Sequence, residues 1–257
     1  MSLTSNPDSK VREISRVLSA DQSLTAKVLK LSNSSFYGRP KGVGTLQDAI
    51  MLLGFFTVRS IVVATSAHTI YTQGESGGAQ VKLWEHSLAT AVAARQIAKH
   101  ARIAGRDEVF IAALLHDIGK LVLLQKLPDA YGEVLEEVEN YKLTFIDVET
   151  SRLGFNHCDV ADLLLGQWKF PMEMRQAILD HHLPPEVSDG KPSAATVVGL
   201  ANYVSKRLGI GFDDGQGELD PPVAMESIMS ENGPDLDTLL EEVRTFYESE
   251  TRIFEES

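Results

Sequence analysis

The sequence predicts an all-α protein built from two helical lobes. Apolar residues recur at helical spacing in nearly every segment, and the alternation typical of strands never lasts beyond a few positions. A glycine-rich stretch, TQGESGGAQ at 72–80, interrupts this pattern. We therefore expect an N-terminal helical lobe over residues 1–75, a second helical lobe over 80–212, and an acidic linker with a C-terminal helix over 213–257.

The N-terminal lobe contains four segments with helical character. The first has apolar residues at 11, 14, 17 and 18, and the second follows Asp21, a candidate cap. The third begins at Thr45 and places Leu46, Ile50 and Leu53 on one face. The fourth, TVRSIVVATSAHTIY, is rich in β-branched residues, which have lower helix propensity.

The second lobe opens with LWEHSLATAVAARQIAKH, whose alanines favour a helix. Asp107 is expected to cap a second helix, which carries ALLHDIGKLVLL and ends near Pro128. Gly154 suits a helix C-terminus, Asn156 a cap, and Pro171 a first turn. These signals predict further helices at 129–141, 144–154, 157–168, 171–182, 192–209 and 234–249.

Composition narrows the possible classes of function. The chain has 24 basic and 36 acidic side chains, a net charge of −12, which opposes general binding to nucleic acid. The basic loop GRPKG at 38–42 is interpreted as a solvated turn rather than a nucleic-acid contact. No apolar run is long enough to predict a membrane span. The single cysteine, Cys158, fits a reducing compartment, so we expect a cytoplasmic protein.

Histidines in the second lobe suggest a metal site. Five of the seven histidines fall in or beside predicted helices, and an aspartate directly follows one of them inside an aliphatic run. Imidazole and carboxylate together suit zinc, iron or manganese, and the core of a helical bundle offers them a common site. His68 and His100 lack this context. The candidate ligands are therefore His86, His116, Asp117, His157, His181 and His182.

The same segments resemble the HDOD family, a branch of the HD superfamily. The resemblance rests on LWEHSLATA, ALLHDIGKLVLL, GFNHCDVADLLLGQWKFP and AILDHH. The first lobe adds LTAKVLKLSNSSFYGRPKGVGTLQDAIMLLGFFTVRSIVV, and together the match covers about residues 10–210. It implies a two-lobed HDOD fold, in which an N-terminal helical bundle packs on an HD-like helical lobe.

The resemblance also implies chemistry. HD-superfamily enzymes are metal-dependent phosphohydrolases, and their ligands correspond to His86, His116 and Asp117. The related HD-GYP phosphodiesterases of cyclic di-GMP add further histidines, which match the remaining three candidates. Lys120 matches their catalytic lysine, and one or two divalent ions are implied.

Three departures weaken the match to an active enzyme. The ligand set of the superfamily ends with an aspartate, whereas GLANYVSK places Asn202 there, and a neutral amide is a poorer ligand. The glutamate that HD-GYP enzymes carry before the first histidine falls on Lys82, whose ammonium cannot bind a cation. The GYP signature is absent from the sequence after the histidine pair.

Two functional hypotheses follow. The first is a bacterial signal-transduction protein without robust catalysis, whose His/Asp pocket is able to bind a metal and which acts through a regulatory protein partner or a small phosphorylated ligand. The second is a metal-dependent phosphohydrolase acting on a cyclic dinucleotide or nucleotide, with Lys120 as its catalytic residue. The departures favour the first hypothesis, and the retained histidines favour the second. Neither fixes the oligomeric state.

Overall fold

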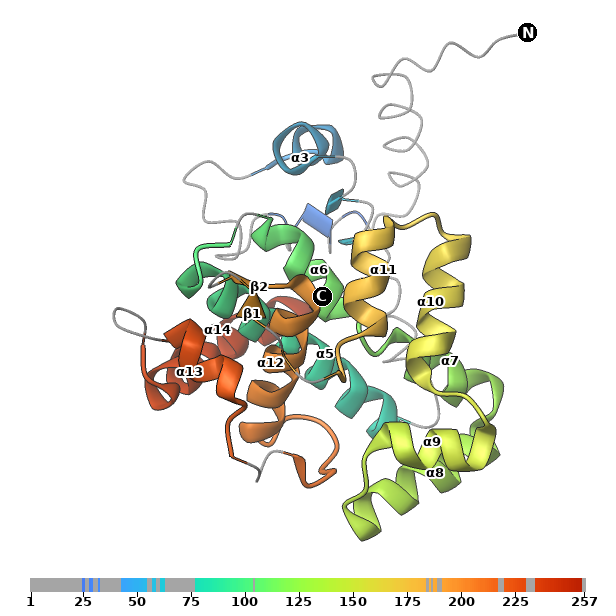
Figure 1. The fold of residues 1–257 in the computed structure, drawn as a ribbon. Helices are drawn as coiled ribbons and strands as arrows, with labels where there is room; N and C mark the ends of the chain where they lie inside the picture. The colour runs from blue at the N-terminus through green and yellow to red at the C-terminus, as the bar shows by residue number, and fades with distance from the viewer. Residues whose placement is uncertain are drawn as a thin grey trace, which may run out of the picture. The chain divides into compact units, whose positions relative to one another are not determined.

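The described part of the chain is almost entirely helical. The structure is a computed structural model, and it describes residues 43–54, 77–103, 105–183, 191–216, 220–229 and 234–255, with short pieces at 25, 28–29, 32, 57–58, 61–62, 185 and 187–188. The expected helices before Thr45, and the one at 57–71, lie largely outside these residues. The predicted all-α class is confirmed (Figure 1).

The chain divides into two compact units, one of residues 1–70 with 248–257 and one of residues 71–247. The first contains α3 (Leu46–Leu53), which is capped by the side chain of Thr45. The domain limits drawn from the sequence stay a prediction. The helices of the second unit are α5 (Gly77–His100), α6 (Arg106–Leu115), α7 (Ile118–Lys126), α8 (Pro128–Tyr141), α9 (Phe145–Leu153), α10 (His157–Gln167), α11 (Met172–Leu179), α12 (Ala194–Arg207), α13 (Val223–Met229) and most of α14 (Leu236–Glu255).

Strand structure among the described residues is limited to one short antiparallel pair. Strand β1 (Val187–Ser188) pairs with β2 (Lys191–Pro192), two residues on each side. A two-residue ladder adds little stability by itself, so the helices carry the fold. Within the described residues, none of the helices is both long enough and apolar enough to cross a bilayer.

The core of the second unit forms around α5. This helix packs against α6 and α12, while α11 packs against α6, α10 and α12, and α10 packs against α7. Small residues on α5 such as Ala89, Ala93 and Ala94 are fully buried, which allows its neighbours to approach closely. Helices α5, α6, α11 and α12 therefore pack around a shared interior, with α10 against α11 (Figure 1).

The expected single helix over 108–127 is wrong. It breaks into α6 and α7 at His116 and Asp117, which are the C-cap of one and the N-cap of the other. Aliphatic residues fill both helices, so their pattern continues through the break and conceals it. Adjacent side chains on a continuous helix diverge by about 100°. The break removes this limit on where the two side chains point.

Helix ends follow the sequence signals in most cases. Asn156 forms a capping box with Asp159 at the start of α10, Thr144 caps α9, and Gly154 ends α9 with φ of 79°. The expected cap at Asp107 is wrong, because Gly105 occupies the N-cap position of α6 and Asp107 lies within its first turn. An acid there still interacts favourably with the helix dipole.

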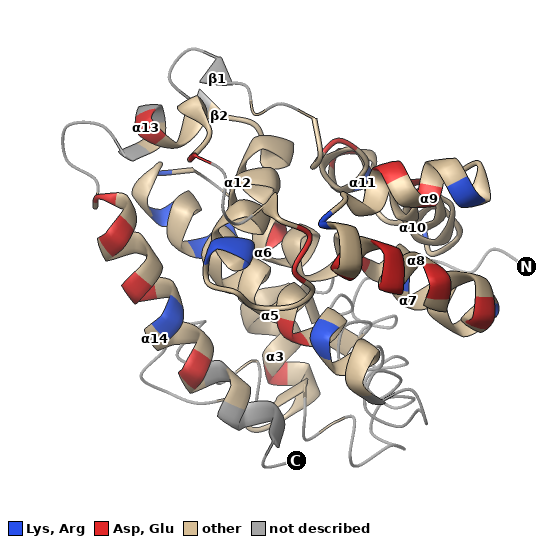
Figure 2. Ribbon diagram, turned by 90° about the horizontal axis from the view of Figure 1, so that it is seen from below, with Lys and Arg blue, Asp and Glu red and all other residues tan. Residues whose placement is uncertain are grey.

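Acidic side chains are concentrated on particular helices of the second unit. Figure 2 shows them recurring along α8 and α14. On α14, Leu239 and Val243 are buried, as expected for one face of an amphipathic helix. Helix α13 was not expected, since its residues fall in the segment predicted to be an acidic linker.

We expect Asn156→Ala to lower the free energy of unfolding by about 1 kcal/mol, because the cap side chain accepts hydrogen bonds from the backbone N–H groups of Cys158 and Asp159. Urea denaturation monitored by circular dichroism measures this change. Thr144→Ala removes the cap of α9 and is the matched comparison. It should lower the free energy of unfolding by a similar amount. No loss of stability in Asn156→Ala would contradict the capping role.

Candidate metal centre

The six candidate ligands lie together in the interior of the second unit. His86 comes from α5, His116 and Asp117 from the α6–α7 junction, His157 from the first position of α10, and His181 and His182 from the turn after α11. Centroids of neighbouring imidazole rings are separated by 4.0–5.7 Å. All six side chains are buried except that of His182, which is exposed. Their role as metal ligands stays a prediction.

Asp117 lies between two groups of histidines. Its Oδ2 is 3.4 Å from Nε2 of His116 and 3.7 Å from Nε2 of His86, while its Oδ1 is 3.3 Å from Nε2 of His157. Nitrogens that bind one ion at about 2.0–2.1 Å lie roughly 3 Å from the other ligand atoms of that ion. The carboxylate therefore has one oxygen available to each group.

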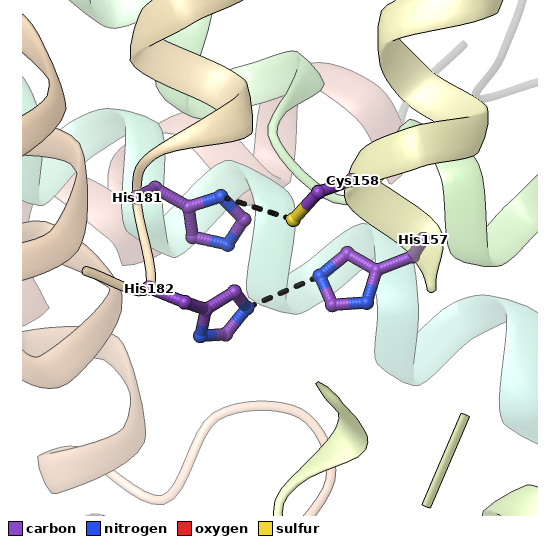
Figure 3. A group of neighbouring side chains, drawn as sticks. All are labelled: His157, Cys158, His181 and His182. Carbon is purple, nitrogen blue, oxygen red and sulfur yellow. Dashed lines mark hydrogen bonds between the residues drawn. The ribbon is translucent and has the colours of Figure 1, made fainter. Parts of the chain in front are cut away.

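The second group contains His157, His181 and His182, and Figure 3 shows it together with Cys158. Nε2 of His157 and Nε2 of His182 approach to 3.1 Å, and Cys158 Sγ lies 3.8 Å from Nδ1 of His181. Burial raises the pKa of the Cys158 thiol, which favours the protonated form. We interpret Cys158 as a packing residue beside the cluster.

Three of the imidazoles are oriented by hydrogen bonds between Nδ1 and a backbone carbonyl. Nδ1 of His116 contacts the carbonyl of Ala113 at 2.6 Å, and Nδ1 of His181 contacts that of Ile178 at 2.6 Å. Nδ1 of His86 contacts the carbonyl of Ile210 at 3.1 Å. A ring that donates from Nδ1 carries its lone pair on Nε2, the tautomer needed for a metal ligand on that side.

His157 has a different kind of partner. Its Nδ1 lies 2.6 Å from Oε2 of Glu149, and the same oxygen accepts a bond of 2.8 Å from the backbone N–H of His157. The other oxygen of Glu149 accepts from Tyr131 at 2.6 Å. A carboxylate partner makes imidazole a stronger donor than a carbonyl partner does. Glu149 thus places negative charge behind one ligand.

Sequence reasoning missed Glu149. It is fully buried on α9, next to the apolar residues Phe145 and Val148. Glu149 lies four positions after Phe145, on the apolar face of the predicted helix. An acid on that face is the signal that would have indicated a buried partner.

Several buried polar atoms in the cluster have no hydrogen-bond partner. They are Nε2 of His116, Oδ1 of Asp117, Nε2 of His181 and Oδ1 of Asn202. An unpaired buried polar atom costs about 1–3 kcal/mol, and four in one place call for an explanation. Cations held by the two groups of candidate ligands would accept the lone pairs on His116, Asp117 and His181. The residues present therefore fit a divalent metal ion.

Burial also keeps the ligands in the protonation state that metal binding needs. It lowers the pKa of His86 from 6.5 to about 3 and the pKa of His181 well below its usual value. Burial acts to raise the pKa of Asp117, but the neighbouring His116 and Lys120 outweigh it and hold that pKa well below 3.8. Neutral imidazoles and an ionised carboxylate are the forms that bind metals.

The two lysines named in the sequence analysis have separate locations. Lys120 is buried, donates to Oδ2 of Asp117 at 2.8 Å, and lies 3.8 Å from the ring centroid of Phe145. Lys82 is half-exposed, bonds Glu139 at 2.6 Å, and lies over the ring of Phe212. Lys120 thus contacts the cluster directly, whereas Lys82 is engaged elsewhere.

Helices α7 and α10 meet without a side chain between them. A Cβ atom added to Gly119 would lie 1.9 Å from the carbonyl oxygen of His157, a distance that no substitution tolerates. Gly119 follows Asp117 by two positions, so this contact brings the carboxylate and His157 to the same place.

The sequence matches the family model of the HDOD domain over residues 1–184. The chain belongs to the HDOD family. The resemblance drawn from the sequence motifs is therefore confirmed. The match spans residues 1–70 of the first unit and the part of the second unit that carries His86, His116, Asp117, His157, His181 and His182.

Solved structures with the same fold agree with membership of the HDOD family. An HDOD domain protein of unknown function from Geobacter sulfurreducens has a TM-score of 0.70 and 23% identity, covering 97% of this chain and 87% of that one. A putative metal-dependent phosphohydrolase from Shewanella amazonensis has a TM-score of 0.59 and 18% identity, covering 95% and 87%.

The MmoQ response regulator from Methylococcus capsulatus has a TM-score of 0.51 and 24% identity, covering 90% of this chain and 89% of that one. At these identities the likeness shows the HDOD fold alone. No curated protein matches the sequence.

Removing the charge behind His157 should weaken metal binding. We expect Glu149→Gln to reduce affinity for a divalent ion about tenfold to a hundredfold, because the amide keeps the shape but lowers the donor strength of the imidazole. Isothermal titration calorimetry with Mn²⁺ or Zn²⁺ measures this. Glu133→Gln, which removes an exposed carboxylate paired with Arg152, is the control and should leave affinity unchanged. Equal affinities in wild type and Glu149→Gln would contradict the role of Glu149.

The metal-free protein should lose stability as the pH falls from about 7 towards 4. Unfolded His86 takes up a proton near 6.5, whereas folded His86 does so only near 3, so protons favour the unfolded state throughout this interval. Urea denaturation at a series of pH values measures the slope, which should be smaller in His86→Gln. Stability that does not change between pH 7 and pH 5 would refute the expectation.

Proposed function

We propose that this protein is a metal-binding regulatory module. In this proposal the cluster holds a divalent ion, and the protein acts by binding a partner or ligand rather than by rapid turnover. The observation that carries it is the set of four buried, unpaired atoms on His116, Asp117, His181 and Asn202. Hydrogen bonds to Nδ1 orient the rings in advance, so an ion would meet ligands already in place.

The ligand types favour iron, manganese or zinc. Imidazole and carboxylate suit these ions, whereas calcium and magnesium prefer oxygen ligands alone. Two ions are compatible with the arrangement, because the two oxygens of Asp117 face different groups of histidines. A bound ion would supply a Lewis acid and an acidic water.

Two residues argue against efficient hydrolysis. Asn202 contributes a neutral oxygen where the superfamily has an aspartate, so the ion would retain more of its charge. Lys82 replaces a glutamate and is bonded to Glu139 instead of facing the cluster. The metal would then serve mainly to order the surrounding helices. A signalling partner would be able to recognise the ordered surface of these helices.

The structural neighbours are in keeping with a signalling role. One is named a response regulator, and this proposal extends that role to the present chain. We further propose a cytoplasmic location, since a single cysteine fits a reducing compartment.

A second candidate function is metal-dependent phosphoester hydrolysis. The specific observation in its favour is Lys120, a buried ammonium 2.8 Å from Asp117, close enough to the cluster to interact with a phosphate bound there. A neighbour named as a metal-dependent phosphohydrolase has the same fold.

One set of variants distinguishes these functions. We expect wild type, loaded with Mn²⁺ or Fe²⁺, to bind metal but to show weak or no turnover of cyclic di-GMP. His116→Ala should lose most of the bound metal, and Asn202→Asp should bind it more tightly because a carboxylate adds charge. Elemental analysis of protein purified without chelator or a His-tag measures the metal, and chromatography of the nucleotides measures turnover.

His100→Ala is the matched control, because His100 pairs with Glu242 outside the cluster. It should retain the metal content of wild type. Robust wild-type hydrolysis that disappears in His116→Ala would establish the second function instead. Equal metal content in wild type and His116→Ala would refute the metal centre itself.

A further inference from the structure

A pocket of about 160 Å³ opens beside the histidine cluster. One wall is a single face of α12, formed by Gly199, Asn202, Tyr203 and Lys206, at the spacing of successive helical turns. His181 and His182 line it on the side of the cluster. The remaining walls include Gln216, Asp220 and Pro222. A pocket next to a metal centre is a place where a ligand of that metal would lie.

Lys206 lines both this pocket and a hollow next to the histidine cluster. Its side chain is 10% exposed, and it also lines a smaller hollow of about 10 Å³ together with His86, Asp117 and Lys120. It therefore borders the ligand-sized pocket on one side and the candidate metal ligands on the other. Its partner in the structure is Asp214, at 2.6 Å.

The balance of buried charge calls for an anion here. Among the described residues, the buried carboxylates are Asp117, Glu149 and Asp214. Lys120 is paired with Asp117, and Lys206 with Asp214, so Glu149 is the one left to offset a metal ion. A divalent ion would exceed that charge and would lie near two ammonium groups. An anionic ligand bound between the ion and Lys206 would relieve this repulsion.

Asn202 is a second polar side chain on the same wall of the pocket. Its side chain is 6% exposed, lies one turn before Lys206 on the same wall, and carries a buried Oδ1 without a hydrogen-bond partner. The N–H groups of the amide are able to donate to an oxyanion, while Oδ1 is the atom assigned above to the metal ion.

We propose that this pocket is a binding site for the oxyanion group of a small molecule, with Lys206 and Asn202 as its protein contacts. The proposal rests on the metal centre put forward above and assigns the kind of ligand that completes it. Lys206 provides the charge-assisted contact, and Asp214 competes with the ligand for that ammonium. The pocket has room for more than the anion, so the body of the ligand would lie between Tyr203 and Asp220.

The test measures anion binding to protein loaded with Mn²⁺. Inorganic phosphate and ribose 5-phosphate are titrated into the loaded protein by isothermal titration calorimetry. Lys206→Met should weaken binding of both by about tenfold or more, because it removes a charge-assisted hydrogen bond. Asp214→Asn should tighten it, because the lysine loses its competing partner. Neither variant should lose Mn²⁺ binding, because neither removes one of the proposed metal ligands.

Lys142→Met is the matched control. Lys142 pairs with Asp213, the neighbour of Asp214, but does not line the pocket. The double variant Lys206→Met/Asp214→Asn removes the ion pair as a unit, so that weak binding in it is not due to an unpaired buried aspartate. It should bind phosphate as weakly as Lys206→Met.

Tighter binding of ribose 5-phosphate than of phosphate would support a ligand whose body occupies the pocket. Phosphate affinity that is the same in wild type, Lys206→Met and Asp214→Asn would overturn the proposal while leaving the metal centre intact. The same titrations are run on metal-free protein. Failure of wild type to bind Mn²⁺ would refute the metal centre. If phosphate binding to the metal-free protein is then also the same in wild type and Lys206→Met, the anion site is refuted as well.

Discussion

The structure of the second unit depends on a single requirement, which is that several imidazole rings present Nε2 to one buried carboxylate. Each ring must be held from behind, since an imidazole free to rotate would turn its lone pair towards other donors. Backbone carbonyls of Ala113 and Ile210 do this for His116 and His86, and Glu149 does it for His157. These anchors come from helix ends and from α9, so the positions of whole helices follow from the orientation of a few rings.

Helix boundaries serve the same requirement. His116 and Asp117 occupy the junction of α6 and α7, and His157 is the first residue of a helix fixed by the capping box of Asn156. Residues at helix ends have backbone geometries that differ from those inside a helix. Their side chains therefore reach directions that regular helical spacing does not allow.

The sequence was a good guide wherever the signal was local. The caps at Thr144 and Asn156 and the stop at Gly154 involve residues within four positions of one another, and the structure has them as expected. The break between α6 and α7 left no local signal, since the aliphatic residues on both sides continue one pattern. The assignment of α5 was right in kind, although the helix begins at Gly77, inside the glycine-rich stretch.

The polar residues were harder to predict because their roles depend on tertiary contacts. Glu149 looks like one more acid in the segment FIDVETSRL, and only packing against Tyr131 and His157 makes it a buried partner. Lys206 lies in the last turn of α12, where a cation ordinarily interacts with the helix dipole in solvent. Lys206 is instead buried against Asp214, and the sequence of α12 alone does not indicate this contact.

The contact at Gly119 has a consequence for how such a protein changes over evolutionary time. The separation of α7 and α10 is set by main chain against main chain, so no side chain at this contact is available to lengthen or shorten it. Mutation is able to exchange one ligand for another within the fixed frame, as an asparagine in place of an aspartate would do with no change of shape. A metal site of this kind would then be able to change its ligands one at a time while the architecture around it persists.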